Sequence, residues 1–328
     1  MSLADELFKD MCRDIIENGT DTRGQKARPH WPDGTPAYTI KKFGVVNRYD
    51  LQKEFPALTL RRTAIKSATN EMLWIWKDKS NNIHDLKSTV WDEWADEEGS
   101  IGSAYGFQMK KKYAWNDIKR EGIEQVYGVD FKPLEIDEPT QVSRVIESSQ
   151  ELNDAHVIYN RADGMYYMDQ VDKVLYDLKV TPFSRRILTN MYTFSDLPGM
   201  HLYPCAYSMT FNVTEENGQL VLNGVLNQRS QDVLAANNWN VCQYSVLLHM
   251  IARDCGMKAG TLVHMIADAH IYDRHVEVIE ELIKRPSLPA PQFWLNPEKK
   301  DFYSFTEQDV RLDHYETGEQ IKNIPIAI

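Results

Sequence analysis

The chain has 328 residues, a formal net charge of -11 and 42% hydrophobic residues, an ordinary balance for a globular protein. The negative charge argues against broad binding to DNA, and no stretch approaches the roughly 20 apolar residues needed to cross a membrane. The four cysteines lack the paired spacing of a metal motif and do not suggest a disulfide framework. The amino-terminal segment is too charged for a secretory signal, so we expect a cytoplasmic protein.

The first third of the chain is expected to contain two helices and intervening strands. Apolar spacing predicts a helix over Leu3–Ile16, ended by Asn18-Gly19, and strands within Tyr38–Leu51. A second helix is predicted over Thr63–Lys77, and it carries Glu71 beside a run of apolar residues. A carboxylate with such neighbours lies at a helix edge or is buried for a reason.

The middle of the chain, from residue 110 to about 165, mixes charged residues with few apolar repeats. We expect a small helical or irregular insert there, within a single domain that covers residues 1–328. The basic run Lys110-Lys111-Lys112 is interpreted as a solvated surface. A helix is predicted to follow over Asp169–Leu178.

The second half of the chain contains a hairpin pattern. Ser208–Val213 and Leu220–Gln228 alternate polar and apolar residues, which predicts two strands that turn at Glu216–Gly218. A helix is predicted over Asn238–Gly256, followed by a strand over Thr261–His270. This mixture of strands and helices predicts an α/β (α+β) fold.

Cys205 is the main candidate for a nucleophile. It stands at the start of the first hairpin strand, and Arg229-Ser230 stands at the exit of the second. A cysteine attacks as its thiolate, and a nearby cation lowers the pKa of the thiol. Arg229 is a permanent cation whose planar guanidinium also suits a phosphate. The alternative for a lone cysteine is a small buried hydrophobe.

The histidines near the end of the chain do not form a metal motif. His264, His270 and His275 lack the helical or Cys/His ligand spacing of known sites, although Asp268 is close in sequence. His270 and Tyr272 alternate along one strand face and could both bond a ribose hydroxyl. No glycine-rich phosphate-binding motif occurs, so Rossmann and nucleotide-hydrolysis functions lack support. We expect no metal.

Four motifs occur in a fixed order. They are Y-P-C-A-Y at 203–207, N-Q-R-S-Q-D at 227–232, N-N-W-N-V at 237–241 and A-D-A-H-I-Y at 267–272. This order resembles the thymidylate synthase family over most of the chain except the insert. The resemblance implies a large mixed β-sheet flanked by helices and a homodimer that pairs through its sheets. It also implies reductive methylation of dUMP to dTMP by 5,10-methylenetetrahydrofolate.

The resemblance further implies roles for individual residues. The implied catalytic set is Cys205, Glu71, Asn240, Arg229, Tyr105 and His270. The implied dUMP-binding set is Arg28, Arg185, Arg186, Gln228, Arg229, Ser230, Asp232, Asn240, His270 and Tyr272. The implied folate-binding set is Arg61, Trp91, Trp94, Asp232, Trp239 and Ala327. Arg185 and Arg186 would reach the partner's site, and Arg23 is the alternative to Arg28.

Three positions depart from the family pattern. Ala206 replaces a histidine, Arg61 replaces a lysine, and Ala235–Trp239 replaces the sequence L-G-x-P-F. We expect the Asn237-Asn238 pair in this last segment to make the folate side of the site more polar. Two other functions stay open: a hydroxymethylase, in which water captures the methylene, and a folate- or RNA-binding relative without catalysis. Closure by Trp91 and the apolar carboxyl terminus would exclude water and favour hydride transfer.

Overall fold

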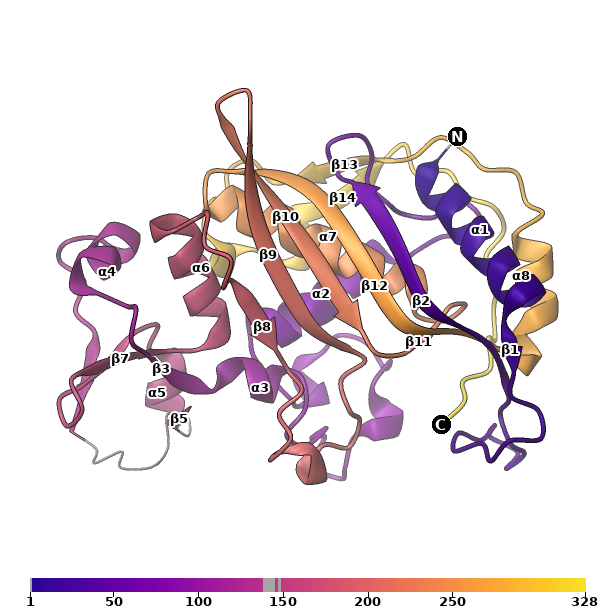
Figure 1. Ribbon diagram of the computed structural model, residues 1–328, viewed down its shortest axis with the longest axis horizontal. Helices are drawn as coiled ribbons and strands as arrows, with labels where there is room; N and C mark the ends of the chain where they lie inside the picture. The colour runs from indigo at the N-terminus through magenta and orange to yellow at the C-terminus, as the bar shows by residue number, and fades with distance from the viewer. Residues whose placement is uncertain (1, 138–144, 147–148) are drawn as a thin grey trace.

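The computed structural model describes residues 2–137, 145–146 and 149–328, and its centre is a twisted mixed sheet (Figure 1). The strand order is β1-β2-β12-β10-β9-β8, with β11 also paired to β12. The strands are β1 (Thr20–Asp21), β2 (Thr39–Asp50), β8 (Leu188–Asn190), β9 (Ala206–Glu216), β10 (Gln219–Gln228), β11 (Gln231–Asp232) and β12 (Lys258–Tyr272). Strands β10 and β12 are parallel, whereas β12 and β2 are antiparallel. The expectation of an α/β fold with a large mixed sheet is confirmed.

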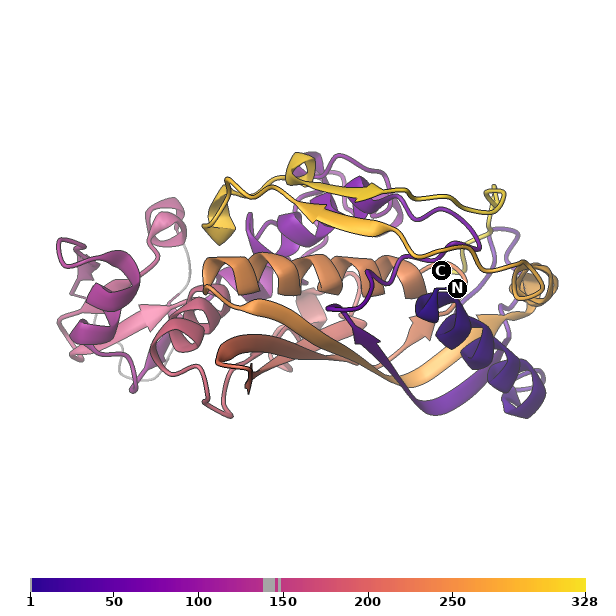
Figure 2. The same cartoon turned by 90° about the horizontal axis from the view of Figure 1, so that it is seen from above.

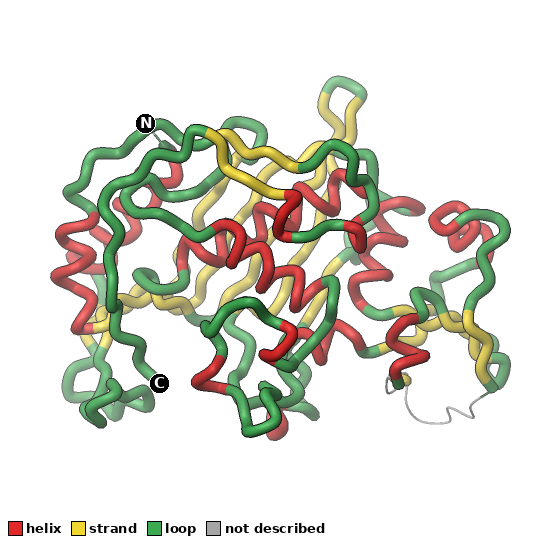
Figure 3. Tube along the Cα trace, turned by 180° about the vertical axis from the view of Figure 1, so that it is seen from behind, coloured by secondary structure: helices red, strands yellow, loops and turns green. Residues whose placement is uncertain are grey.

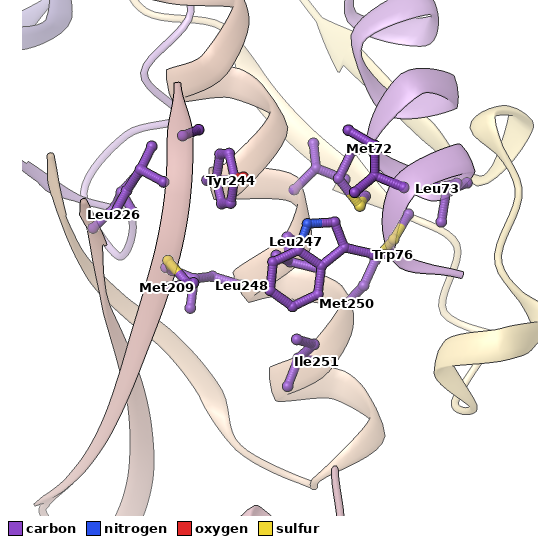
Figure 4. Close-up of a cluster of buried hydrophobic side chains, with 14 of the residues drawn as sticks. Met72, Leu73, Trp76, Met209, Leu226, Tyr244, Leu247, Leu248, Met250 and Ile251 are labelled. Carbon is purple, nitrogen blue, oxygen red and sulfur yellow. The ribbon is translucent and has the colours of Figure 1, made fainter. Parts of the chain in front are cut away.

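Two helices cover one face of this sheet, as Figures 2 and 3 show from above and from behind. They are α7 (Asn237–Asp254) and α2 (Ile65–Trp76), which pack against each other. The core between them and the strands contains a large apolar cluster (Figure 4), which includes Trp76, Met209 and Leu248. Burial of such side chains supplies most of the driving force for folding. Across the described ranges, no helix is both long and apolar enough to span a bilayer.

The β9–β10 hairpin fixes the position of Cys205. Its turn contains Asn217 and Gly218, both with positive φ, 53° and 78°. Such an Asn-Gly pair gives the tight turn that matches the twist of the two strands. The hairpin register pairs Gln228 with Ala206, so the start of β9 lies beside the end of β10. Cys205 and Arg229 are neighbours for this reason, as the alternation predicted.

The remaining elements close the ends of the sheet. Helix α1 (Leu3–Asn18) and helix α8 (Val276–Leu282) form a second apolar cluster with the end of β12, through Phe8 and Ile271 among others. Strands β13 (Gln292–Leu295) and β14 (Val310–Asp313) form a separate hairpin. Short 3₁₀ turns occupy Ile83–Asp85, Asp92–Trp94, Leu197–Gly199, Asp273–His275, Phe302–Ser304 and Glu307–Asp309.

The insert is not the helical or irregular segment that we expected. It contains a second sheet of order β4-β6-β7-β3-β5, at the left of Figure 1. In chain order, the elements between residues 106 and 180 are α3 (Gly106–Lys110), β3 (Lys112–Trp115), α4 (Arg120–Tyr127), β4 (Leu134–Ile136), β5 (Val145–Ile146), α5 (Gln150–Asp154), β6 (Ile158–Asn160), β7 (Met165–Met168) and α6 (Gln170–Val180). Strands this short show no usable alternation, which explains the wrong prediction. Residues 138–144 and 147–148 of the insert lie outside the described residues.

The basic run is also placed differently from the prediction. Lys112 is completely buried, and its Nζ donates to Asp169 Oδ2 at 2.8 Å and to the Ala155 carbonyl at 2.8 Å. Lys111 pairs with Asp196. Lys112 belongs to a group of polar residues, half-buried at His156 and Tyr303 and buried elsewhere, that connects the insert to the segment after α2 and to the Phe302–Ser304 turn. We call it the junction cluster, and its members are Lys79, Lys112, His156, Asp169, Asp172 and Tyr303.

Candidate active site

Cys205 is half-buried immediately before β9. The Nη2 of Arg229 lies 3.6 Å from its Sγ. The same guanidinium donates to the carbonyls of Tyr203, at 2.6 Å, and Pro204, at 3.0 Å, and the Arg229 amide donates to the Cys205 carbonyl. These bonds hold a permanent positive charge against the sulfur, as the hairpin pattern predicted.

The charge does not overcome the effect of burial on the free thiol. Burial raises the pKa of the Cys205 thiol, and the charges of Arg229 and Arg28 act in the opposite direction. The effect of burial therefore exceeds that of the two arginines, and it favours the neutral thiol over the thiolate.

Tyr105 holds the backbone of the cysteine. Its hydroxyl accepts a hydrogen bond from the Cys205 amide at 3.1 Å. Tyr105 itself has a φ of 48°, unusual for a residue other than glycine. Gly106 follows, and a Cβ there would lie 1.9 Å from the Ser80 carbonyl oxygen, so only glycine fits. The Tyr-Gly pair is thus explained by close packing as well as by contact with Cys205.

Asn240 is the centre of a group of side-chain amides. Its Oδ1 accepts from Gln228 Nε2 at 3.1 Å and from Gln231 Nε2 at 3.2 Å. Its Nδ2 donates to Gln243 Oε1 at 3.0 Å. Gln228 in turn contacts His264 Nε2 through Oε1, at 2.8 Å. We call the series His264, Gln228, Asn240, Gln243 and Glu71 the amide chain. The sequence did not reveal Gln243 as a site residue, and it suggested His264 only as a metal ligand. Nothing in the spacing of these two residues distinguishes them from core residues.

Glu71 lies at one end of this chain and is buried, as its apolar neighbours suggested. Burial raises the pKa of its carboxyl group to about 6, although Gln243, Trp239 and Trp91 act to lower it. The indole nitrogen of Trp239 donates to Glu71 Oε2 at 3.0 Å. The Trp91 ring meets the Tyr105 ring at 4.8 Å between centroids and the half-buried Trp94 ring at 5.7 Å. Glu71 is therefore connected to both the amide chain and the aromatic residues.

His270 and Tyr272 lie together at the end of β12. Their rings are edge to face with 5.1 Å between centroids, and His270 Nδ1 is 2.9 Å from Asp268 Oδ1. Burial raises the pKa of the Tyr272 hydroxyl to about 12, with Asp232 adding to the effect and Arg28 opposing it. Within the described ranges, no group of histidine, cysteine and acidic side chains has the geometry to hold a metal ion.

Asp232 links the site to the carboxyl-terminal segment. It accepts from the backbone amides of Leu234 and Ala235, at 3.0 and 3.1 Å. His275, completely buried, has Nδ1 at 3.5 Å from Asp232 Oδ1 and Nε2 at 2.8 Å from the Pro325 carbonyl. Sequence reasoning considered His275 only as a metal ligand and missed this connection. Arg61 donates to the Leu234 carbonyl on the other side of Asp232.

The terminal residues are tied to the segment that follows β1. The amide of Ile328 donates to the His30 carbonyl at 2.9 Å, and the His30 amide donates back at 2.7 Å. The half-buried Ala327 is held between this pair of bonds and the Pro325 contact. The apolar terminus is thus held through both Pro325 and Ile328.

The arginines predicted to bind phosphate fall into two groups. Arg28 acts electrostatically on both Cys205 and Tyr272. Arg23 is paired with Asp21 on the surface, so Arg28 is the better of the two alternatives. Arg185 and Arg186 are exposed in the turn before β8, and Ser230 is half-buried directly after Arg229. The structure of one chain brings neither Arg185 nor Arg186 to Cys205.

The expectation for Asn237 and Asn238 is wrong. Both are buried, with 1% and 5% of their surface exposed. Asn238 accepts from the Leu58 amide and the Thr63 hydroxyl and donates to the Pro56 carbonyl. Asn237 donates to Gln231. Since these bonds use the two amides inside the protein, they do not make the site more polar. Ala206 is buried and adds no functional group beside Cys205.

A half-buried thiol beside a fixed guanidinium is a feature of enzymes that use a cysteine for covalent catalysis. The protein-family model for thymidylate synthase matches residues 6–327. Thymidylate synthases from Bacillus subtilis subsp. natto and from Bacillus phage phi3T are each 34% identical over 325 residues, covering 98% of both chains. The solved structure of thermostable thymidylate synthase A from Bacillus subtilis matches with a TM-score of 0.77 and 32% identity, covering 99% of both chains.

The chain belongs to the thymidylate synthase family. It is therefore an enzyme of the methyltransferase class that makes thymidylate, and members of this family bind dUMP and a folate co-substrate. The alternatives of a hydroxymethylase and of a relative without catalysis receive less support from these matches.

Proposed function

We propose that the chain converts dUMP to dTMP through a covalent bond between Cys205 and carbon 6 of uracil, with 5,10-methylenetetrahydrofolate as the second substrate. The observation that carries this proposal is the 3.6 Å contact between the Cys205 thiol and the Arg229 guanidinium. Addition of a thiolate to carbon 6 makes carbon 5 nucleophilic, which uracil alone is not. The folate supplies the one-carbon unit and the hydride that reduces it.

The residues around the thiol have separate tasks in this proposal. Arg229 stabilises the thiolate and, with Arg28 and Ser230, binds the phosphate of dUMP. His270 and Tyr272 bind the ribose. Asn240 and Gln228 bind the uracil ring, and Glu71 orders the water that moves protons.

The folate would lie between the aromatic residues and the Asp232 region. Trp91, Trp94 and Trp239 provide flat apolar surfaces, and the Asp232 carboxylate accepts from N–H groups. Arg61 would meet an anionic part of the folate, and Ala327 would cover it. The fit is supported by Asp232, whose pKa burial acts to raise but the His275 contact holds below its usual value, so the carboxylate stays charged.

The second face of the sheet is the surface where a homodimer would form. Phe43, Val46 and Met265 are exposed there, at 88%, 48% and 44%, and they border a groove with Tyr207. Exposed apolar side chains gathered on one face support the proposal of an interface there. A two-fold dimer through this face would give Arg185 and Arg186 a route to the partner's phosphate site.

Incubation with dUMP and methylenetetrahydrofolate, followed by identification of both products, tests the reaction. We expect dTMP and dihydrofolate. Hydroxymethyl-dUMP with tetrahydrofolate would instead establish the hydroxymethylase alternative, and no product would favour a binding protein. Removal of Ile328 should suppress reduction but leave the folate-independent dehalogenation of bromo-dUMP intact.

A mixing experiment tests the shared site. Arg186→Ala and Cys205→Ser proteins should each be inactive, but a hybrid dimer holds one intact site. Random exchange of equal amounts should therefore restore about a quarter of the unmodified activity. A mixture that stays inactive, although mass spectrometry shows hybrid dimers, would mean that each site is built from one chain.

A further inference from the structure

We infer that His264, acting through Gln228, fixes the orientation of the Asn240 side-chain amide. This orientation makes the site select uracil over cytosine. This inference rests on the proposed function, in which Asn240 binds the base. An asparagine amide has a donor end and an acceptor end, and turning it over exchanges them. One orientation matches the N3–H and O4 of uracil, and the other matches the N3 and amino group of cytosine. Asparagine therefore discriminates only if its orientation is held.

His264 sets the orientation at one end of the amide chain. It is completely buried on β12, and burial lowers the pKa of its imidazole to about 3, so the ring is neutral with a single N–H. Its Nδ1 has no hydrogen-bond partner among the described residues, whereas Nε2 faces Gln228 Oε1 at 2.8 Å. A proton on Nε2 leaves no buried donor unsatisfied. Gln228 then accepts from His264 and turns its nitrogen to Asn240.

Trp239 and Glu71 set the orientation at the opposite end. An indole N–H can only donate, and the Trp239 indole donates to the Glu71 carboxylate at 3.0 Å. The Gln243 side chain acts to lower the pKa of Glu71, and only its nitrogen can donate to that carboxylate, although this Nε2 lies beyond hydrogen-bond distance of every described acceptor. Its oxygen then faces Asn240 Nδ2, at 3.0 Å. Both ends of the amide chain thus favour the same orientation of Asn240.

Gln231 also holds the Asn240 amide, and its own partner is Asn237, in the segment that departs from the family pattern. Asn237 donates to Gln231 Oε1 at 2.9 Å, and Gln231 Nε2 then donates to Asn240 Oδ1 at 3.2 Å. If Asn240 turned over, its NH₂ group would face the nitrogens of two glutamines. These residues would all have to rearrange in a buried space, which disfavours the orientation that suits cytosine.

The test measures kcat/KM for dUMP and for dCMP in the full-length enzyme and three variants. His264→Phe removes the donor but keeps a flat ring, and it should lower the dUMP-to-dCMP preference about tenfold or more. His264→Gln restores an N–H donor and should return the preference to within about threefold of the original. His249→Phe is the matched control, because His249 is an imidazole on α7 that packs between Phe55 and Phe293. It should change the preference by less than about twofold.

Folding is checked first by circular dichroism and melting temperature. A folded His264→Phe protein with unchanged preference would overturn the inference, as would an equal loss of preference in His249→Phe. If His264→Phe does not fold, Gln231→Met removes the second donor to Asn240 and should lower the preference about threefold. An unchanged preference in that variant would also overturn the inference. Equal use of dUMP and dCMP by the unmodified enzyme would refute base reading by Asn240 itself, a different failure.

Discussion

Two groups of buried polar residues in this protein are built on opposite principles. The junction cluster is ionic: Lys79 and Lys112 both donate to Asp169 Oδ2, at 2.6 and 2.8 Å. The amide chain is neutral except at Glu71, and the Gln243 nitrogen in it has no hydrogen-bond partner among the described residues. Buried charges are stable only when they are opposed, and the same two lysines also lie 3.7 and 3.9 Å from Asp172 Oδ2, so the charges of the junction cluster are balanced within the protein itself. The amide chain keeps capacity for a ligand.

The pKa shifts follow the same division. Burial acts to lower the pKa of Lys79, but Asp169 and Asp172 raise it above its usual value, so the junction stays charged. At the site, burial dominates and raises the pKa values of both Glu71 and Cys205. A variant in the junction cluster should therefore change stability, and a variant in the site should change rate.

The largest effect is expected for Cys205→Ser. Loss of the thiolate should lower kcat by roughly 10⁴-fold or more, because a serine hydroxyl is a far weaker nucleophile. The melting temperature should stay within a few degrees, since Cys205 is only half-buried. Steady-state assays and calorimetry measure the two quantities. Near-normal activity would refute the covalent mechanism.

The counterpart in the junction cluster is Lys112→Met. Removal of one partner of a buried ion pair should lower the free energy of unfolding by about 3–5 kcal/mol. Lys132→Met, at an exposed position of the insert, is the control and should change it by less than about 0.5 kcal/mol. Urea unfolding gives both values. Equal stabilities of the two variants would show that the cluster does not hold the insert to the segments that carry Lys79 and Tyr303.

Asn240→Asp should change substrate choice without a comparable loss of stability. A protonated aspartic acid presents a donor and an acceptor suited to cytosine, so the preference for dUMP should weaken or invert, by about 100-fold in the ratio of kcat/KM. Competition assays with both nucleotides measure this ratio. An unaltered ratio would remove Asn240 from base recognition.

The pH dependence of the rate should report Glu71. Its pKa is raised to about 6 by burial, so the carboxylate is lost as the pH falls through about 6 and kcat should decline there. In Glu71→Gln this acid limb should disappear and the plateau should be lower. A limb at the same pH in the variant would assign it to another group.

The smallest effect concerns His156 at the edge of the junction cluster. Its hydrogen bond with Asp172, at 2.9 Å, raises the pKa of the imidazole above its usual value. The stabilisation is complete below the unfolded pKa, near 6.5, and is lost as the pH rises through the higher folded value. Between pH 6 and 8, the melting temperature should fall more steeply with rising pH for the unmodified protein than for His156→Gln. An equal dependence of the melting temperature on pH in the two proteins would mean that the pKa of His156 does not change on folding.

The elements with a clear repeat were predictable from the sequence. Alternation in β9 and β10, with Asn217-Gly218 between them, was enough to place Cys205 beside Arg229. Helical spacing located α1, α2, α6 and α7 to within a few residues. Local sequence determines these features because the hydrophobic period and the turn chemistry act over neighbouring residues.

The tertiary structure alone decided the remaining features. Strands of two to four residues in the insert are stabilised by partners distant in sequence, so their own pattern could not reveal them. Lys112 reads as a surface lysine, but Asp169 lies 57 residues away and makes its burial possible. The sequence suggested that Asn237 and Asn238 are polar site residues, but both form their hydrogen bonds with partners inside the protein. Whether a polar side chain faces ligand, solvent or core depends on which partners the fold brings to it, and those contacts have no local signature.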